Sequence, residues 1–440
     1  VTSSGTLVLS GSGTYEISDL SYLPLSVDVT GGTLNVSGDT TVRNESNIWI
    51  GNTATFDAQS VTVSSGGSVS VANGGTLTTG SLSIEQGGSV FLYQSPLDTL
   101  NVTSLSGNGE LVLATAMGFN KDTLPEVHTL LDNFGGALTL KGAGESVFDY
   151  SSMNVPLEQI LTLGMDGMVL HIAKGASLNM RLPDDKAASR LIGTTINLSE
   201  GGTLSHGVVN GNKFNATYTN GITIVETQGV TDDSATIKVP GYMRGIATSK
   251  LNGSGTLTIQ RLNGYNNDPG LFSQSTFAID GVDDNETNRF TGEIVVNSPN
   301  DGTKYTYLSL NHQLAAQKAK ISLQGTFSGL FLGADNVIVT GLESPQATAR
   351  IEVLPNLTNE TPYTLTVKGI ANYAGKIGGN LSLDLAGGVE HVLSGDLSAF
   401  TGTITVADNT ASNLTLSGSS SADGVNLSMS QGNLTTGVKV

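Results

Sequence analysis

The stretch SVTVSSGGSVSVANGGTLTTGSLSIEQGGSVFLY, Ser60–Tyr93, alternates apolar residues with Ser, Thr and Gly over short runs. A period of two residues is typical of a β-strand with one buried face. Gly-Gly pairs separate the runs, and the pairs that begin at Gly66 and Gly87 lie 21 positions apart. Periods of about 20 residues built from short strands indicate a solenoid, in which each coil stacks on the preceding one.

The composition excludes several classes of protein. Glycine supplies 56 of the 440 residues, without the every-third-position spacing that collagen requires. The chain has no cysteine, so disulfides, thiol nucleophiles and thiolate metal sites are excluded. A net charge of −18 disfavours nucleic acid and anionic membranes as partners. No apolar run approaches the ~20 residues of a membrane helix, so we expect no membrane-spanning segment in this chain.

The pattern divides the chain into three segments. Residues 1–115 carry the regular alternation and predict an all-β solenoid, whereas residues 116–190 are less regular and indicate an insertion or a cap. Within the second segment, LPEVHTLLDNFGG from Leu124 has short helical character. Residues 191–440 return to short strands, with polar loops and a few short helical turns. A β-sandwich or barrel array is the alternative, but its strands usually run to ~5–6 residues with core aromatics, which favours the solenoid here.

Two later stretches repeat one phrase: NRFTGEIVVNS from Asn288 and SAFTGTITVAD from Ser398. Each places Phe-Thr-Gly before a short alternating strand. We expect the aromatic and aliphatic members to face the core and to stack on like residues in neighbouring coils. We expect Gly292 to adopt a backbone conformation that is closed to other residues. The repeat residues are Phe290, Gly292, Ile294, Val296, Phe400, Gly402, Ile404 and Val406.

The phrase RFTGEIVVNS, followed by YLSLNHQLAAQKAKISLQGTFSGLFLGADNVIVTGLE from Tyr307, resembles the autotransporter-associated β-strand repeat. LSGDLSAFTGTITVADNTASNLTLSG from Leu393 resembles the same unit. The resemblance implies a right-handed parallel β-helix in the exported passenger region of an autotransporter, located extracellularly or on the outer cell surface. The chain ends SMSQGNLTTGVKV, without the terminal membrane domain of whole members of that family. We therefore expect a passenger portion, a processed fragment or a differently anchored relative.

Carboxylates are the main candidates for catalysis or metal binding. Asp280, Asp283, Asp284 and Glu286 lie within seven residues and could hold Ca²⁺, the one cofactor that we consider. A polysaccharide lyase would need a base beside them, such as Arg289 or Lys304. Neighbours in an extended strand point to opposite faces, and the cluster lies in turn-like sequence, so we expect solvated turns and no catalysis.

The histidines and the single tryptophan complete the set of candidate residues. The histidines have no metal-ligand spacing, so we expect solvated or loop positions for them; they are His128, His171, His206, His312 and His391. Trp49 alternates with Ile48 and Ile50, and on a strand it therefore faces away from them. Both a sugar-stacking role and ordinary packing are open for Trp49.

These observations favour a non-enzymatic, extracellular β-solenoid that acts as an adhesin, a spacer or a binding scaffold. Long faces of Thr, Ser and Asn would offer repeated hydrogen bonds to glycans or proteins at a cell or matrix surface. Two alternatives are a carbohydrate-active β-helix enzyme, either a polysaccharide lyase or a hydrolase, and a structural filament subunit. The filament would form by end-to-end self-association, because solenoid ends can pair strand to strand.

Overall fold

The computed structural model describes residues 5–20, 26–43, 45–51, 53–72, 74–94, 97–151, 168–181, 189–207, 215–226, 233–239, 245–262, 275–298, 304–355, 357, 362–387, 389–407, 412–417 and 425–436. The chain forms two compact units. The first comprises Val1–Pro183 with Ile192–Asn197, and the second comprises Asp184–Leu191 with Leu198–Val440.

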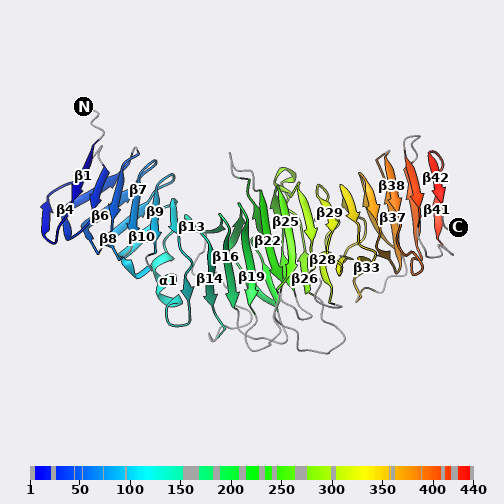
Figure 1. Cartoon of the computed structure of the whole chain (residues 1–440), viewed down its shortest axis with the longest axis horizontal. Helices are drawn as coiled ribbons and strands as arrows, with labels where there is room; N and C mark the ends of the chain where they lie inside the picture. Colours follow the sequence, from blue (N-terminus) through cyan, green and yellow to red (C-terminus); the bar gives the residue numbers. More distant parts are fainter. Residues whose placement is uncertain are drawn as a thin grey trace. The chain divides into compact units, whose positions relative to one another are not determined.

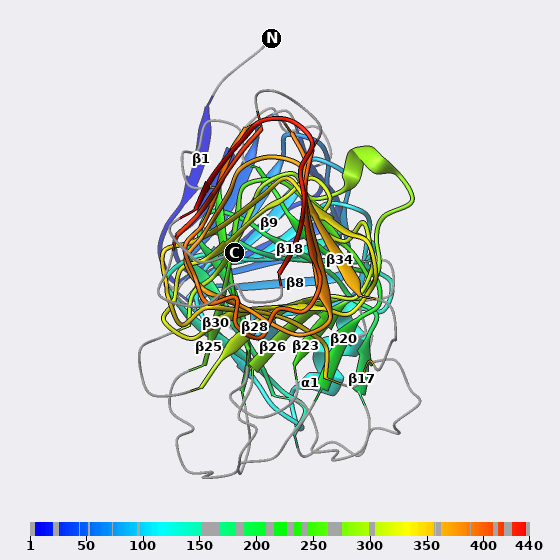
Figure 2. The same cartoon turned by 90° about the vertical axis from the view of Figure 1, so that its right-hand side faces the viewer.

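The first unit is a parallel β-helix, as expected from the period-two pattern (Figure 1). Within each coil the chain passes from one sheet to the next. Sheet I contains β1 (Thr6–Leu9), β3 (Ser26–Val29), β5 (Asn47–Ile50), β7 (Ser68–Ala72), β9 (Ser89–Tyr93), β11 (Glu110–Leu113), β13 (Ala137–Leu140) and β15 (Val169–Ile172). Sheet II contains β2 (Thr14–Ile17), β4 (Thr33–Val42), β6 (Thr55–Val63), β8 (Thr76–Ile84) and β10 (Leu100–Ser106). Figure 2 shows β8 and β9 running in different directions, because they lie on two sides of the coil.

The segment after β11 brings in a third set of strands and the helix. Sheet III of the first unit contains β12 (Gly118–Phe119), β14 (Gly144–Asp149) and β16 (Ala176–Arg181). The 3₁₀ turn η1 (Leu97–Thr99) precedes β10, and α1 (Leu124–Leu131) follows β12. The helix begins at the leucine where the sequence indicated helical character. Strands β17 (Ser189–Ile192) and β18 (Thr195–Leu198) lie where the chain divides into its two units.

The second unit is also a parallel β-helix. Its sheet IV contains β19 (Gly202–Gly207), β22 (Ser234–Val239), β25 (Thr256–Arg261), β27 (Glu293–Val296), β29 (Lys320–Leu323), β32 (Gly341–Ser344), β35 (Ala371–Tyr373), β38 (Glu390–Leu393), β40 (Asn413–Leu416) and β42 (Asn433–Thr436). Sheet V contains β20 (Asn215–Tyr218), β23 (Ile246–Thr248), β26 (Ser275–Ile279), β28 (Thr306–Leu310), β30 (Ser328–Leu332), β33 (Arg350–Val353) and β36 (Lys376–Ile377).

The remaining strands of the second unit complete its coils. β21 (Ile222–Ile224) pairs with β24 (Leu251–Gly253). Sheet VI contains β31 (Val337–Val339), β34 (Tyr363–Val367), β37 (Leu381–Leu385), β39 (Thr403–Val406) and β41 (Asn426–Ser428). A 3₁₀ turn, η2 (Glu286–Asn288), lies in the loop before β27. No helix among the described residues is long and apolar enough to cross a membrane.

The Gly-Gly pairs mark the corners of the coils. Gly66 N donates a hydrogen bond to Gly87 O at 2.9 Å, so turns 21 residues apart stack directly. In the pairs that begin at Gly66 and Gly87 the first glycine is left-handed, with φ of 76° and 82°, respectively. The second glycine is needed for space, because a Cβ on Gly67 would lie 2.2 Å from Val42 O. In the Gly66–Gly67 pair, one glycine therefore adopts the left-handed conformation and the next permits close approach of the coils.

Aliphatic columns form the core. Val69, Val90, Leu111 and Leu138 occupy the same register position on successive strands of sheet I, and all four are fully buried. Burial of each such side chain stabilises the fold by roughly 1.5–3 kcal/mol. Because each column needs neighbours above and below it, stability depends on the stacking of coils and not on any single strand.

The two Phe-Thr-Gly phrases bury their aromatic residues, but they lie on different sheets. Phe290 and Phe400 are 2% and 3% exposed, and they precede β27 of sheet IV and β39 of sheet VI, respectively. Gly292 does not have a left-handed φ, so the conformational reason that we gave for it is wrong. A Cβ there would lie 1.8 Å from Gly255 O, and one on Gly402 would lie 1.9 Å from Leu381 O. Contact with the neighbouring coil is what requires glycine.

Candidate functional site

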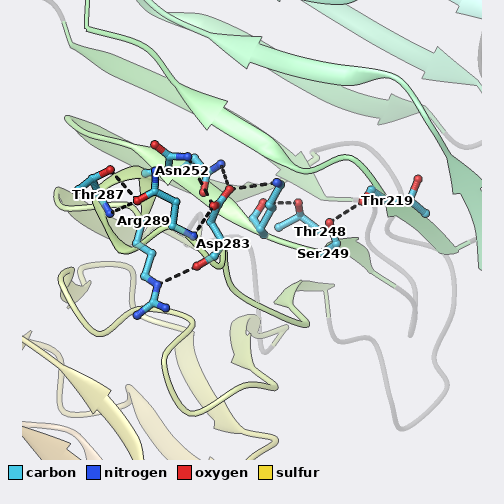
Figure 3. Close-up of polar contacts among 10 residues, drawn as sticks. Thr219, Thr248, Ser249, Asn252, Asp283, Thr287 and Arg289 are labelled. Atoms are coloured by element: carbon cyan, nitrogen blue, oxygen red, sulfur yellow. Dashed lines mark hydrogen bonds and ion pairs between the residues drawn. The ribbon is translucent and has the colours of Figure 1, made fainter. Parts of the chain in front are cut away.

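Asp283, from the predicted acidic cluster, anchors a loop to the neighbouring coil of the second unit. Its Oδ2 accepts hydrogen bonds from Lys250 Nζ and from Asn252 Nδ2, each at 3.0 Å. Its Oδ1 accepts the backbone N–H of Asn285 at 3.0 Å, and its carbonyl oxygen accepts Arg289 Nε at 2.9 Å. Figure 3 shows Asp283 directed at Asn252, with the guanidinium group of Arg289 on the other side of the aspartate. The carboxylate is therefore fully occupied with partners in the chain.

The electrostatics of Asp283 suit an anchor better than a base. The hydrogen bond from Lys250 is the largest influence, and together with those from Asn252 and Asn285 it lowers the pKa of Asp283 to about 2, although burial opposes this. A carboxylate with such a low pKa accepts a proton poorly, whereas a general base works best with a pKa near the operating pH. We infer that Asp283 holds the loop closed.

The other predicted carboxylates are directed elsewhere. Asp280 accepts Asn311 Nδ2 at 2.6 Å, and Glu286 accepts Gln317 Nε2 at 3.3 Å. Asp284 is exposed. Within the described ranges, no three His, Asp or Glu side chains are grouped so that they could hold a metal ion. The structure therefore does not bring the four acidic residues together as a calcium ligand set.

Among the described residues, neither candidate base, Arg289 or Lys304, has a side-chain contact with a carboxylate group of the four acids. Arg289 bonds the backbone oxygen of Asp283, as described above. The carbonyl oxygen of Lys304 accepts Arg261 Nη1 at 3.4 Å and Ser298 Oγ at 3.3 Å.

Two histidines depart from the sequence interpretation. His206 and His391 are fully buried, so their predicted placement in solvated loops is wrong. His206 Nε2 lies 2.7 Å from Tyr218 Oη, and burial lowers the pKa of His206 to about 3. His391 Nδ1 accepts the backbone N–H of Ala371 at 3.3 Å. Both histidines occupy inward-facing positions of strands, β19 and β38, and they are therefore surrounded by core residues.

An aromatic surface lies on the outer face of sheet I, and it is the best candidate for ligand binding. As the alternation predicts, Ile48 and Ile50 are buried while Trp49 points outward and is half-buried. The ring centroids of Trp49 and Tyr93 are 5.9 Å apart, and those of Tyr93 and Phe91 are also 5.9 Å apart. Three rings on two strands therefore form one continuous surface, which we call the aromatic surface.

Strand β7 lies between β5 and β9, and its residues explain how rings on these two strands meet. Ser70 of β7 lies in register between Trp49 and Phe91, and it is small enough to let the rings close over it. It is only 7% exposed. A Cβ on Gly51 would lie 2.9 Å from Trp49 Nε1, so the absence of a side chain at Gly51 leaves room for the indole ring. Small residues beside large ones therefore allow the rings of separate coils to come together on the outer face of sheet I.

Charged groups border the aromatic surface on one side. Lys141 Nζ lies 6.0 Å from the ring centroid of Phe91 and 3.4 Å from Glu110 Oε1. Thr139 Oγ1 donates to the same carboxylate oxygen at 2.6 Å. On the other side, Asp28 is in register with Trp49 on β3. The aromatic surface thus has apolar ring faces with charged and hydrogen-bonding groups beside them.

Sequence reasoning identified Trp49 but missed Phe91 and Tyr93. The sequence does indicate that Phe91 faces the same way as Trp49, because it lies 42 residues later, which is two periods of the 21-residue coil. No family model matches the chain, and no curated protein or solved structure matches it.

Proposed function

We propose that this chain is a non-enzymatic binding scaffold outside the cell, and that it binds glycans through the aromatic surface of Trp49, Phe91 and Tyr93. The observation that carries the proposal is the continuous set of outward-facing rings. Large apolar side chains on an outward face cost solubility, and a patch of this kind is typical of an interaction site.

The shape and chemistry of the surface favour a sugar over a protein partner. Aromatic faces carry negative charge density and attract the C–H faces of pyranose rings, while hydroxyl groups reach polar neighbours. Trp49 and Phe91 are on strands two apart, a spacing of about 10 Å, which is comparable with the length of a disaccharide. Asp28 and Glu110 at the rim supply acceptors for sugar hydroxyl groups.

The experiment uses a panel of glycans and the single tryptophan as a built-in probe. We expect a binding glycan to change Trp49 fluorescence, and Tyr93→Ser or Phe91→Ser to raise Kd about tenfold or more, which corresponds to ~1.4 kcal/mol. Phe327→Ser is the matched control, because Phe327 is a half-buried aromatic residue in the second unit. Equal affinity in the wild type and Tyr93→Ser contradicts the proposal.

The same polysaccharides test the enzymatic alternative. We expect no release of reducing ends or unsaturated products during prolonged incubation. If the wild type cleaves a polysaccharide and Asp283→Ala does not, the chain is a carbohydrate-active enzyme and the proposal of a non-enzymatic scaffold is wrong.

The extracellular location rests on the Phe-Thr-Gly repeat resemblance and on the expected ligand. Protease treatment of intact producing cells tests it: we expect the chain to be cleaved from the surface or recovered from the medium. Retention inside protease-resistant cells would contradict this part of the proposal.

A further inference from the structure

Side chains that lie in register on the outer face of sheet I alternate between apolar and polar from coil to coil. Val8 of β1 pairs with Asp28 of β3, and Asp28 pairs with Trp49 of β5. Ser70 of β7 and Phe91 of β9 continue the same line, and we call these residues the outer column. Apolar side chains therefore recur at every second coil of the outer face, whereas every coil contributes apolar residues to the core.

The apolar members of the outer column are accessible to a ligand. Val8 is 57% exposed although it is aliphatic, and Trp49 and Phe91 are half-buried. The next residues in register after Phe91 are Val112 and Thr139, and both are fully buried. The accessible part of the column therefore extends from β1 to β9, a length of about 19 Å for strands ~4.8 Å apart.

A second line of residues, beside the outer column, is polar in every coil from β5 to β9. Asn47 is in register with Ser68, and Ser68 is in register with Ser89. All three are half-buried, and Asn47 Oδ1 accepts hydrogen bonds from Ser68 Oγ at 3.0 Å and from Ser70 Oγ at 3.3 Å. Each residue of this line lies two positions before the outer column on its strand and so points to the same face. Each of these coils thus offers a hydrogen-bonding side chain next to the outer column.

On the basis of the function proposed above, we propose that the ligand of the aromatic surface is a linear, neutral, β-1,4-linked glycan of the glucose configuration, which lies along the axis of the first unit. Both bonds that link each sugar in such a glycan are equatorial, so the chain is extended and successive sugars are rotated by half a turn. The same groups therefore face the protein at every second sugar. Two sugars span about 10 Å, close to the ~9.6 Å rise of two coils.

This match of repeats places one sugar over each coil. The sugars over Val8, Trp49 and Phe91 contact apolar side chains, and those between them lie over Asp28 and Ser70. The Asp28 carboxylate accepts hydrogen bonds from neutral sugar hydroxyl groups and repels uronic acids. An α-1,4-linked glycan winds into a helix and loses this register. A glycan that lay along one strand would meet the apolar residues of a single coil.

The experiment titrates the full chain with oligosaccharides and follows Trp49 fluorescence. The probes are β-1,4-linked oligomers of glucose and of N-acetylglucosamine, from the dimer to the hexamer. We expect Kd in at least one series to fall tenfold or more from dimer to pentamer and to change less than twofold from pentamer to hexamer. The α-1,4-linked hexamer of glucose should bind at least tenfold more weakly than the best β-1,4-linked hexamer. Equal affinity for the two linkages, or affinity that does not depend on length, overturns the proposal.

A variant at the far end of the column tests the direction of the ligand. Val8→Ser should raise Kd of the β-1,4-linked hexamer at least threefold and leave Kd of the dimer unchanged, because only the longer ligand reaches from Phe91 to β1. Ile370→Ser is the matched control, since it removes an aliphatic side chain that is 61% exposed in the second unit. Equal effects of the two substitutions on the hexamer overturn the lengthwise orientation.

The same titrations separate this proposal from the more general one. If neither β-1,4-linked series binds, but another glycan does and Tyr93→Ser weakens it, the aromatic surface is a glycan site and the linkage and orientation proposed here are wrong. If no glycan changes Trp49 fluorescence, the glycan-binding function itself is wrong.

Discussion

The ring of Tyr307 on β28 lies across Gly329 on the neighbouring strand β30, and a Cβ on Gly329 would come within 2.2 Å of Tyr307 Cε1. The ring continues beyond this glycine to stack on Phe331 with centroids 3.8 Å apart, and its hydroxyl donates to Glu352 Oε2 at 3.2 Å. One missing side chain thus allows an aromatic residue to connect three coils on the outer face of sheet V.

Gly329→Ala should therefore destabilise the second unit by about 1–3 kcal/mol, the usual cost of overpacking. Chemical denaturation followed by tyrosine fluorescence measures the change. Gly13→Ala is the control, because a Cβ there meets no atom within 4 Å and its φ is not left-handed. If both variants unfold at the same denaturant concentration as the wild type, the ring does not depend on the glycine.

Phe400→Ala should cost about 3–5 kcal/mol, because the side chain is buried and the surrounding coils cannot close a gap of that size. Solenoids can unfold in parts, so hydrogen exchange of the β37, β39 and β41 amides is the appropriate measurement. We expect faster exchange in those strands. Val8→Ala removes an exposed side chain, 57% accessible, and should change exchange little. Unchanged exchange around Phe400 would show that the phenylalanine is not a core residue.

His206 should make the second unit less stable as the pH falls below about 6.5. Its pKa is about 3 in the folded chain against 6.5 in the unfolded chain, so the unfolded chain binds the extra proton between these values. Stability is complete above pH 6.5 and decreases by up to ~1.4 kcal/mol per pH unit down to pH 3. Denaturation of the wild type and of His206→Gln between pH 7.5 and 4.5 measures it.

The variant should show a smaller loss over this range, because it removes the titrating group. Asp283 does not interfere, since its depressed pKa contributes stability that is lost only as the pH falls below 3.8 toward 2. Parallel pH profiles of wild type and variant would contradict the assignment to His206.

Asp283→Ala should release the loop that it anchors and cost about 1–3 kcal/mol, because the donors of Lys250 and Asn252 lose their shared acceptor. Hydrogen exchange of residues 284–289 should accelerate. Asp284→Ala is a matched control at the exposed neighbouring position, and it should change stability by no more than about 0.5 kcal/mol. Similar effects of the two substitutions would refute the anchoring role.

The sequence predicted those features that repeat and missed those that depend on contact between coils. The period between Gly66 and Gly87 predicted the coil, and the alternation around Trp49 predicted its outward direction. The close approach of Gly292 to Gly255 O could not be predicted, because the two residues meet only after the coils stack. The burial of His206 was missed for a related reason: a histidine at an inward strand position carries no local signal that distinguishes it from a loop histidine.

The strict 21-residue register between Asn47, Ser68 and Ser89 has a consequence for how such a chain can change its length. Gain or loss of one whole coil keeps every side chain on its own face, whereas an insertion of a single residue inverts the strand that follows. The packing of the core therefore does not depend on the number of coils. The aromatic surface does: a coil inserted between β5 and β9 would part Trp49 from Tyr93, and a coil deleted there would place Trp49 beside Phe91. Length variants that arise by duplication would keep their fold, whereas the arrangement of the three rings would change.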